Sequence, residues 1–255
     1  MSRLEELQKR FGDLKIGKMG FDELVELQNG LKDITPDEIN SVNGAKLFIE
    51  LLRKYREAVA FNDTLHGENY PDLLQSLLSV GQNGLYSNDL RFIFELIQNV
   101  DDCDYPSTDD CRLDIQFDFN ANKIILKYNE VGFTPFNVFA ITGIAVAAKN
   151  IDSTKNQIGE KGIGFKSVFG VADTVLIQSG WFSFKLHKSD FTIPESFYEF
   201  EEYIPVLGTK MILYVSDKQQ QIGKTKTEKI IMKLKEDITQ RMPCLIKIRF
   251  FFSIN

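Results

Sequence analysis

The stretch IGEKGIGFKSVFGVAD, residues 158–173, places three glycines within six positions directly before an apolar run. Glycine lets backbone N–H groups turn toward a ligand because no side chain stands in the way. The N-terminus of a helix adds unpaired N–H donors and a partial positive charge. A tight surface loop has a similar composition, so the pattern predicts either a glycine bend or an anion-binding loop before a buried helix.

Composition and charge narrow the function classes. The chain has 255 residues, of which 43% are hydrophobic, which is enough for a large core. Its net charge of -6 argues against bulk binding to nucleic acid or to anionic membranes. Cys103, Cys111 and Cys244 form no CxxC pair, so we expect neither a disulfide framework nor a zinc site. We find no signal peptide and no apolar run of bilayer length, which predicts an intracellular protein, cytoplasmic or nuclear.

Residues 1–85 are predicted to form a helical N-terminal extension. Two short amphipathic segments, RLEELQKRFG and GFDELVELQNG, each end at a glycine. A longer segment opens with Thr35 as a helix N-cap and Pro36 at the first helical position. No catalytic constellation occurs in this part of the sequence, so we interpret it as a packing arm.

An amphipathic helix with a polar stripe is predicted next, in NDLRFIFELIQNVDDC, with Asn88 or Asp89 as its N-cap. Its apolar residues share one arc at helical spacing: Phe92, Ile93, Leu96, Ile97 and Val100. Glu95, Asn99 and Asp102 follow one another at i, i+4 and i+7 on the opposite side. This stripe is either an ordinary solvated face or the wall of a polar cleft.

Alternating apolar and polar residues predict strands in the following part of the chain. CRLDIQFDF and KIILKYN form a hairpin around NANK, and DTVLIQSG and WFSFKL form a second one. GTKMILYV predicts a further strand. Between the two hairpins, a carboxylate and a glycine at a strand end precede a segment rich in small residues, which could close over a ligand.

Four segments, FELIQNVDD, NEVGF, GEKGIGFKSVFGVAD and GTKMILYV, resemble in order and spacing a known ATP-binding module. DNA gyrase, the ninety-kilodalton heat-shock chaperones, histidine kinases and the mismatch-repair MutL proteins share this module, which is called GHKL and has the Bergerat fold. The wording is most similar to the chaperone-like ATPase domains of sacsin and of plant NO VEIN-type proteins. The resemblance covers residues 86–217.

The resemblance implies the fold class and the domain organisation. We expect an α/β (α+β) two-layer sandwich, in which helices cover a mixed, mainly antiparallel sheet. The helical extension of residues 1–85 would precede this domain. Residues 218–255 would follow it as a helix, in KTEKIIMKLKEDITQRMP, and a strand that lead into a missing downstream region.

The polar stripe receives roles by resemblance. Glu95 matches the general base that orients or deprotonates the water attacking the γ-phosphate of ATP. Asn99 matches the residue whose side-chain oxygen binds Mg²⁺, an ion that keeps waters and takes phosphate oxygens as further ligands. Asp102 matches a position near the adenine and the ribose. ATP and Mg²⁺ are therefore the expected cofactors.

The glycine-rich stretch matches the family's lid hinge and phosphate cradle. The nucleotide-binding residues expected from it are Gly159, Lys161, Gly162, Ile163, Gly164, Phe165 and Lys166. Lys161 would neutralise phosphate charge, and Lys166 would either do the same or point to solvent. Phe165 would pack beneath the loop. Thr209, in the strand GTKMILYV, matches the threonine that joins the adenine-binding water network.

The adenine acceptor departs from the family pattern. Relatives have a DxGxG aspartate that accepts a hydrogen bond from the adenine amino group, whereas this chain has YNEVGF. Aligning on Gly132 and Phe133 puts Tyr128 at the aspartate position, and a small bulge would instead bring Asn129 or Glu130 into the pocket. We choose Glu130 because a carboxylate accepts from an amine without having to be oriented. Sacsin-like proteins have an acid at the equivalent place. Asn129 and Gly132 are also expected to bind the nucleotide.

The lid departs from the pattern as well. Relatives have Ser or Thr before a lysine, whereas this chain has VAAKN and, a few residues later, DSTK. Either Lys149 or Lys155 could reach the phosphates, or neither. The lid would then close differently.

These observations predict Mg-ATP binding and slow hydrolysis coupled to lid closure, in the N-terminal ATPase module of a larger chaperone-like or scaffold protein. One alternative is a regulatory nucleotide-binding module with little turnover, and another is a DNA-processing GHKL ATPase. Glu95 favours hydrolysis, since a retired ATPase has no chemical need for a carboxylate there. Relatives receive a catalytic Lys or Arg from a following domain, and none is evident before Asn255, so turnover is expected to be slow.

The expected partners follow from this function. They are ATP and ADP, a second copy of the ATPase domain, downstream domains of a longer chain, and an unidentified protein client. We expect neither a membrane nor a nucleic-acid partner.

Overall fold

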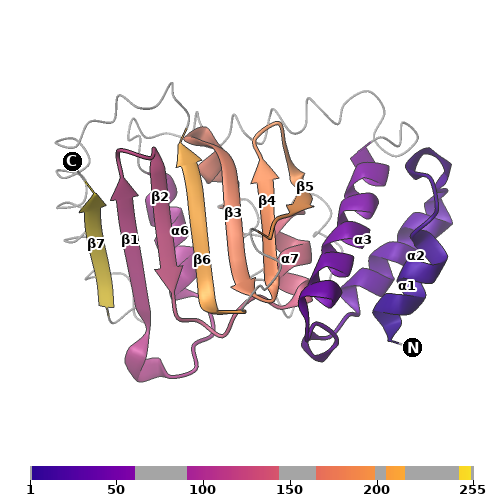
Figure 1. Cartoon of the computed structure of the whole chain (residues 1–255), viewed down its shortest axis with the longest axis horizontal. Coiled ribbons are helices and arrows are strands. Elements are labelled where there is room, and N and C mark those ends of the chain that lie inside the picture. Colours follow the sequence, from indigo (N-terminus) through magenta and orange to yellow (C-terminus); the bar gives the residue numbers. More distant parts are fainter. Residues whose placement is uncertain (1, 61–90, 144–164, 199–204, 216–246, 254–255) are drawn as a thin grey trace.

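A seven-stranded mixed sheet forms the centre of the described part of the chain, in the order β5-β4-β3-β6-β2-β1-β7 (Figure 1). The computed structural model describes residues 2–60, 91–143, 165–198, 205–215 and 247–253. The strands are β1 (Arg112–Asp118), β2 (Lys123–Tyr128), β3 (Ala172–Gly180), β4 (Phe182–His187), β5 (Asp190–Ser196), β6 (Val206–Val215) and β7 (Lys247–Ser253). Neighbouring strands are antiparallel except β1 and β7, which are parallel.

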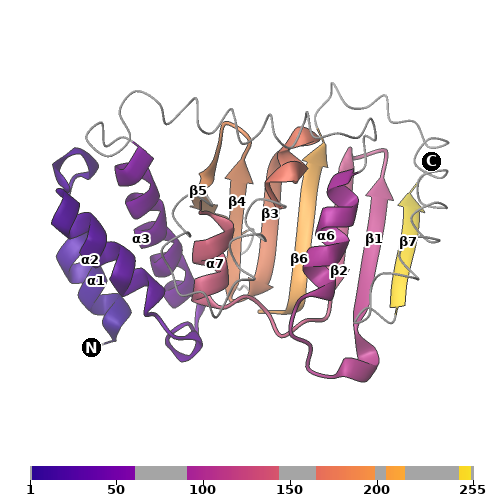
Figure 2. The same cartoon turned by 180° about the vertical axis from the view of Figure 1, so that it is seen from behind.

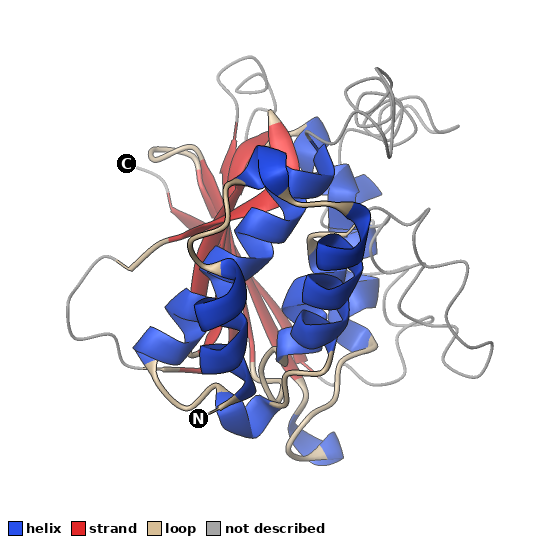
Figure 3. Cartoon of the chain, turned by 90° about the vertical axis from the view of Figure 1, so that its right-hand side faces the viewer, coloured by secondary structure: helices blue, strands red, loops and turns tan. Residues whose placement is uncertain are grey.

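Helices cover one face of this sheet and stand beside one of its edges. The helices α6 (Arg91–Asp101) and α7 (Pro135–Ile141) lie on the same face (Figure 2). The N-terminal helices α1 (Arg3–Phe11), α2 (Phe21–Lys32) and α3 (Val42–Ala60) gather at the end of the sheet formed by β4 and β5 (Figure 1). Seen along the sheet, strands and helices form two layers (Figure 3). The predicted α+β two-layer sandwich is confirmed.

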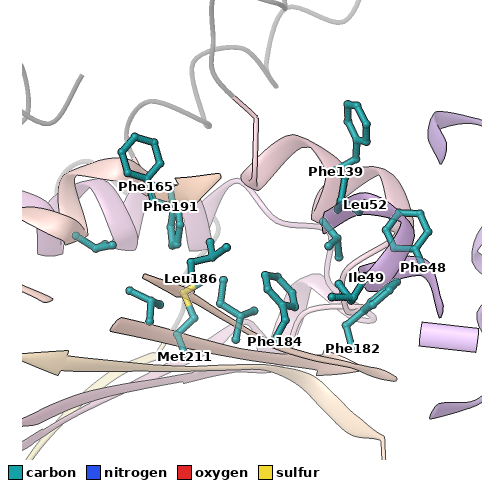
Figure 4. Packing of buried hydrophobic residues seen from close by; sticks show 14 of the residues in the cluster. Phe48, Ile49, Leu52, Phe139, Phe165, Phe182, Phe184, Leu186, Phe191 and Met211 are labelled. Carbon is teal, nitrogen blue, oxygen red and sulfur yellow. The ribbon is translucent and has the colours of Figure 1, made fainter. Parts of the chain in front are cut away.

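The core joins the N-terminal helices to the sheet. Phe182 of β4 points from the sheet toward Phe48 and Ile49 of α3, and Phe184 and Leu186 enter the core further along the same strand (Figure 4). The rings of Phe48 and Phe182 meet edge to face, with their centroids 5.7 Å apart. Such a pair adds about 0.5 to 1.5 kcal/mol to the burial of its area. The N-terminal helices therefore share their hydrophobic core with the sheet.

Local patterning predicted the two hairpins correctly and missed one strand. β1 pairs with β2, and β3 pairs with β4, as expected. β5 was not predicted, and it contains Pro194. Proline cannot donate to a strand ladder, so it argues against a central strand and is tolerated at an edge. β5 is the edge strand of this sheet, which explains why the residue is accommodated there.

The N-terminal helices differ from expectation at two boundaries. α2 does not end at Gly30 and continues to Lys32. Thr35 and Pro36 do not open the long helix. They begin a single 3-10 turn, closed by a capping box between Thr35 and Glu38. The long helix α3 starts afterwards, where the Ser41 hydroxyl accepts from the N–H of Gly44 at 3.2 Å, as an N-cap does.

β7 completes the sheet at its second edge. It lies parallel to β1, and the Arg249 guanidinium donates to both carboxylate oxygens of Asp114 at 2.6 Å. The helix predicted in residues 226–243 lies outside the described residues, as do the proposed domain boundaries at 85 and 217. Within the described ranges, no helix combines the length and the apolar character that crossing a membrane requires.

Gly208 should tolerate no side chain, because its φ is +78° and an added Cβ would lie 2.9 Å from Asn129 Cα and closer still to the Tyr128 carbonyl oxygen. We expect Gly208→Ala to lower the free energy of unfolding by about 2 to 4 kcal/mol, as measured by urea denaturation. Gly170→Ala is the matched control, since a Cβ there has no neighbour within 4 Å, and it should change stability by about 0.5 kcal/mol or less. Equal effects of the two substitutions would contradict this account.

Candidate functional site

A cavity of about 210 Å³ opens between α6, α7 and the sheet. Its wall is mainly apolar, with Leu96 from α6, Tyr128 from β2, Met211 from β6 and Ile141 from α7. Polar groups enter at a few positions only. This combination of an apolar wall with few polar groups is typical of small-molecule sites.

The polar stripe of α6 forms part of this wall. The five apolar residues of the opposite arc are all buried, so α6 packs on the sheet as predicted. Asn99 and Asp102 line the cavity, which favours the cleft wall over an ordinary solvated face. Glu95 lies one turn before Asn99 and is half-buried, but it is not among the lining residues. The predicted N-cap, Asn88 or Asp89, lies outside the described residues.

Glu130 places a buried carboxylate in the cavity. Only 5% of the residue is exposed. The Thr209 hydroxyl donates to one carboxylate oxygen, and the N–H of Gly132 donates to the other at 2.8 Å. Burial raises the pKa of Glu130 above its usual value, while these two hydrogen bonds favour the ionised form and oppose the rise. The loop holding Glu130 turns back at Gly132, whose φ is +96°.

Two hydroxyl groups connect Glu130 to the sheet. The Thr209 and Ser179 side-chain oxygens lie 2.5 Å apart, and both residues are buried. The N–H of Phe133 donates to the Ser179 hydroxyl at 2.7 Å. The loop of residues 130–133 is therefore tied to β6 through Thr209 and to β3 through Ser179. A connected and satisfied polar network of this kind holds its members in one arrangement.

The three residues considered as acceptor of the adenine amine, Tyr128, Asn129 and Glu130, lie in different surroundings. The Asn129 amide is engaged outside the cavity: its oxygen accepts from the N–H of Arg112 at 2.7 Å, and its nitrogen donates to the Asp110 carbonyl at 2.6 Å. Tyr128 lies in the cavity wall, and burial raises the pKa of its hydroxyl well above the usual value. Glu130 is the only one of the three with a carboxylate in the cavity, so the geometry favours it.

The expectation for Lys166 requires a correction. Only 5% of Lys166 is exposed, so the alternative that its ammonium points to solvent is wrong. The ammonium donates to the carbonyl oxygens of Ile141 and Phe191. Burial and the nearby charge of Arg56 lower the pKa of Lys166 well below its usual value. These contacts favour a structural role, and we do not retain Lys166 as a phosphate ligand.

The glycine-rich stretch is described only from its end. Phe165 is buried and lines the cavity, and its ring lies edge to face with that of Phe169, with the centroids 6.2 Å apart. The loop beneath which it was expected to pack lies outside the described residues. A 3-10 segment, Ser167–Gly170, follows Phe165 and Lys166 in the chain. The remaining candidates lie outside the described residues: Lys149, Lys155, Gly159, Lys161, Gly162, Ile163 and Gly164.

Sequence reasoning missed the contribution of α7 to the wall. Thr134, Asn137, Ala140 and Ile141 line the cavity, although this region was assigned only to a closing segment. The sequence does contain a local signal for the start of this helix. Thr134 is an N-cap followed by proline at the first helical position, and Asn137 completes a capping box. Cys103, at the end of α6, also lines the cavity and was treated only as a lone cysteine.

Removing the Thr209 hydroxyl should leave a buried carboxylate oxygen without its donor. We expect Thr209→Val to lower the free energy of unfolding by about 1.5 to 3 kcal/mol in urea denaturation. Thr174→Val is the matched control, because the Thr174 hydroxyl contacts His187 Nδ1 at 3.0 Å in a less buried place. Its cost should stay below about 1 kcal/mol. An equal or larger loss in the control would contradict the proposed importance of the Glu130 network.

Comparison with known proteins finds relatives that match part of this chain. No family model matches the chain. It is 42% identical over 106 residues to Protein NO VEIN of Arabidopsis thaliana, which covers 42% of this chain and 4% of that protein. It is 32% identical over 129 residues to the chaperone protein HtpG of Pseudoalteromonas translucida (strain TAC 125), and 28% identical over 131 residues to HtpG of Frankia casuarinae (strain DSM 45818 / CECT 9043 / HFP020203 / CcI3).

The two HtpG matches each cover 42% of this chain and 20% of the chaperone. The chain therefore spans only a small part of the length of the relatives it matches. Together with the mixed sheet and its helical layer, the homology to NO VEIN and HtpG supports the resemblance of this chain to a GHKL-type ATPase domain.

Proposed function

We propose that the cavity binds ATP with Mg²⁺ and that the domain hydrolyses ATP slowly, as a module of a longer chaperone-like or scaffold protein. The observation that carries this proposal is the buried Glu130 carboxylate, held by Thr209 and Gly132 inside a mainly apolar cavity. A buried carboxylate with remaining acceptor capacity is suited to a ligand that donates a hydrogen bond.

The adenine base fits the apolar part of the cavity. Leu96, Tyr128, Met211 and Phe165 offer flat or adaptable apolar surface, on which an aromatic base can pack. The exocyclic amine of adenine is a donor, and Glu130 is the acceptor that we assign to it. We retain Gly132 as the turn that holds this acceptor, and Thr209 as the group that orients it.

The phosphate end of the nucleotide is assigned to the polar stripe of α6. Asn99 lines the cavity, and its amide oxygen is the neutral protein ligand we propose for Mg²⁺, which takes oxygen ligands and keeps several waters. When bound, the ion would neutralise charge on the phosphates. We place Asp102 beside the ribose, because it lines the cavity one turn after Asn99.

Glu95 is proposed as the general base. It lies on the same stripe, one turn before Asn99, so water held near the Mg²⁺ ligand would be within its reach. We propose that the glycine-rich stretch, including Gly159, Lys161, Gly162, Ile163 and Gly164, cradles the phosphates and hinges a lid. Slow turnover, pairing of two domains and binding of a protein client are proposed from the similarity to HtpG, whose name describes a chaperone.

Titration with Mg-ATP and a single-turnover assay would test these assignments. We expect wild type and Glu95→Gln to bind Mg-ATP with similar affinity, because Glu95 acts on water. Turnover of Glu95→Gln should fall by about 10²- to 10⁴-fold. Asn99→Ala should lose Mg²⁺-dependent affinity. Glu50→Gln, at an exposed position of α3, is the matched control and should leave both binding and turnover unchanged.

Three results would contradict parts of this proposal. Absence of Mg-ATP binding by the wild type would reject the nucleotide site. Binding with equal turnover in wild type and Glu95→Gln would remove Glu95 from catalysis, and undetectable turnover in both would favour a regulatory nucleotide-binding module.

The acidity of Glu130 should control nucleotide affinity. Because burial raises its pKa, Glu130 takes up a proton at a higher pH than an ordinary glutamate. A protonated carboxyl group is a poorer acceptor for the adenine amine, so affinity should fall as the pH is lowered through this raised pKa. Glu130→Gln should bind more weakly at neutral pH.

The difference between wild type and Glu130→Gln isolates this effect, because both titrations contain the same ionising phosphates. We expect the two affinities to converge as the pH falls. A constant ratio of affinities from neutral pH to pH 4 would show that ionised Glu130 does not recognise the nucleotide.

A further inference from the structure

The helix α7 stands between the cavity and the N-terminal helices. In Figure 2 it lies between α3 and α6, on the same face of the sheet. One side of α7 contributes Asn137, Ala140 and Ile141 to the cavity wall. Phe139 contacts the N-terminal helices, since its ring stacks on Tyr55 of α3 with the centroids 5.9 Å apart. A shift of α7 would therefore change the shape of the cavity.

Arg56 of α3 binds the end of α7 directly. The residue is 8% exposed, and its Nη2 donates to the Phe139 carbonyl at 2.7 Å. Nε and Nη2 also contact the Thr142 hydroxyl at 3.4 and 3.3 Å. The guanidinium lies 4.6 Å from the centroid of the Phe139 ring. A buried cation is costly unless its donors are used, so these contacts restrict where α7 can end.

Two other cations act on the same helix end. The last carbonyl groups of a helix have no partner within the helix. Arg56 satisfies the carbonyl of Phe139, and Lys166 satisfies the carbonyl of Ile141. Lys32 of α2 places its ammonium 5.4 Å from the centroid of the Phe139 ring. Helices α2 and α3 therefore both contact α7 through side chains that come from outside the sheet layer.

We propose that Arg56 is a positioning residue, through which the N-terminal helices hold α7 in the arrangement that binds nucleotide. The inference rests on the proposed function for its ligand and extends it, because it gives residues 2–60 a role in nucleotide affinity rather than in packing alone. Arg56 itself is not among the residues that line the cavity. Its effect on affinity is accordingly indirect.

The test compares Arg56→Met with Arg53→Met in the full chain. Arg53 lies on the same helix, is half-exposed, and pairs with Glu57 at 2.8 Å, so it controls for loss of an arginine from α3. Hydrogen exchange of the peptide that contains α7 is measured without nucleotide, and Mg-ADP affinity is measured by calorimetry. We expect Arg56→Met to exchange faster in α7 and to bind Mg-ADP about 3- to 30-fold more weakly. Arg53→Met should match the wild type.

Two further variants keep the test decisive. Arg56→Lys can still donate to the Phe139 carbonyl but cannot fork to Thr142, so its affinity should be intermediate. Thr142→Val removes only the hydroxyl, and it should shift exchange and affinity in the same direction by a smaller factor. If Arg56→Met does not fold, these two variants decide the question.

Unchanged exchange in α7 in folded Arg56→Met would overturn the proposal. Faster exchange with wild-type Mg-ADP affinity would also overturn it, since α7 would then move without consequence for the cavity. If the wild type binds no Mg-ADP, the proposed function fails together with the nucleotide part of this inference. The exchange measurement would still decide whether Arg56 positions α7.

Discussion

A carboxylate that is buried in an apolar cavity has to be hydrogen bonded, and this requirement organises the site. Glu130 meets it by using a hydroxyl from β6 and a backbone N–H from its own loop. The hydroxyl of Thr209 is in turn connected to Ser179 of β3, which accepts from the loop at Phe133. Three segments distant in sequence must therefore be in place before the carboxylate can be held. The same bonds favour the ionised form of the carboxylate and oppose the rise in pKa that burial causes, and the ionised form is the better acceptor for an amine donor.

The cavity around this carboxylate depends on two helices with different supports. α6 packs on the sheet through its own apolar arc, and the helical spacing of these apolar residues predicts that packing. α7 is only seven residues long, and its buried residues are Pro135, Val138 and Phe139. Its end is fixed by Arg56 and Lys166, which come from opposite sides in the sequence. The N-terminal helices therefore contribute to the stability of the site. They share the core of the sheet, and they also bind α7, which forms one wall of the cavity.

The relation to NO VEIN and HtpG concerns only part of this chain. The homology covers 42% of the chain, and the chain spans 4% of NO VEIN and 20% of HtpG. Within this chain, the contact between Arg56 and α7 connects the proposed nucleotide site to the N-terminal helices, outside the polar stripe and the glycine-rich stretch.

The sequence by itself determined the elements whose signals are local. The helical spacing of Phe92 to Val100, the alternation in both hairpins and the four resembling segments predicted α6, β1 to β4, β6 and the fold class, because periodicity records which side of an element is buried. Tertiary structure alone showed that the Glu130 side chain is buried in the cavity while the Asn129 amide is engaged outside it, because β2 ends at Tyr128 and the Thr209 hydroxyl that binds Glu130 comes from β6. It also decided the burial of Lys166 and the acceptance of Pro194 in β5. Those outcomes depend on the carbonyl end of α7 and on an open sheet edge, which are contacts between residues far apart in the chain and therefore leave no pattern within a short stretch of sequence.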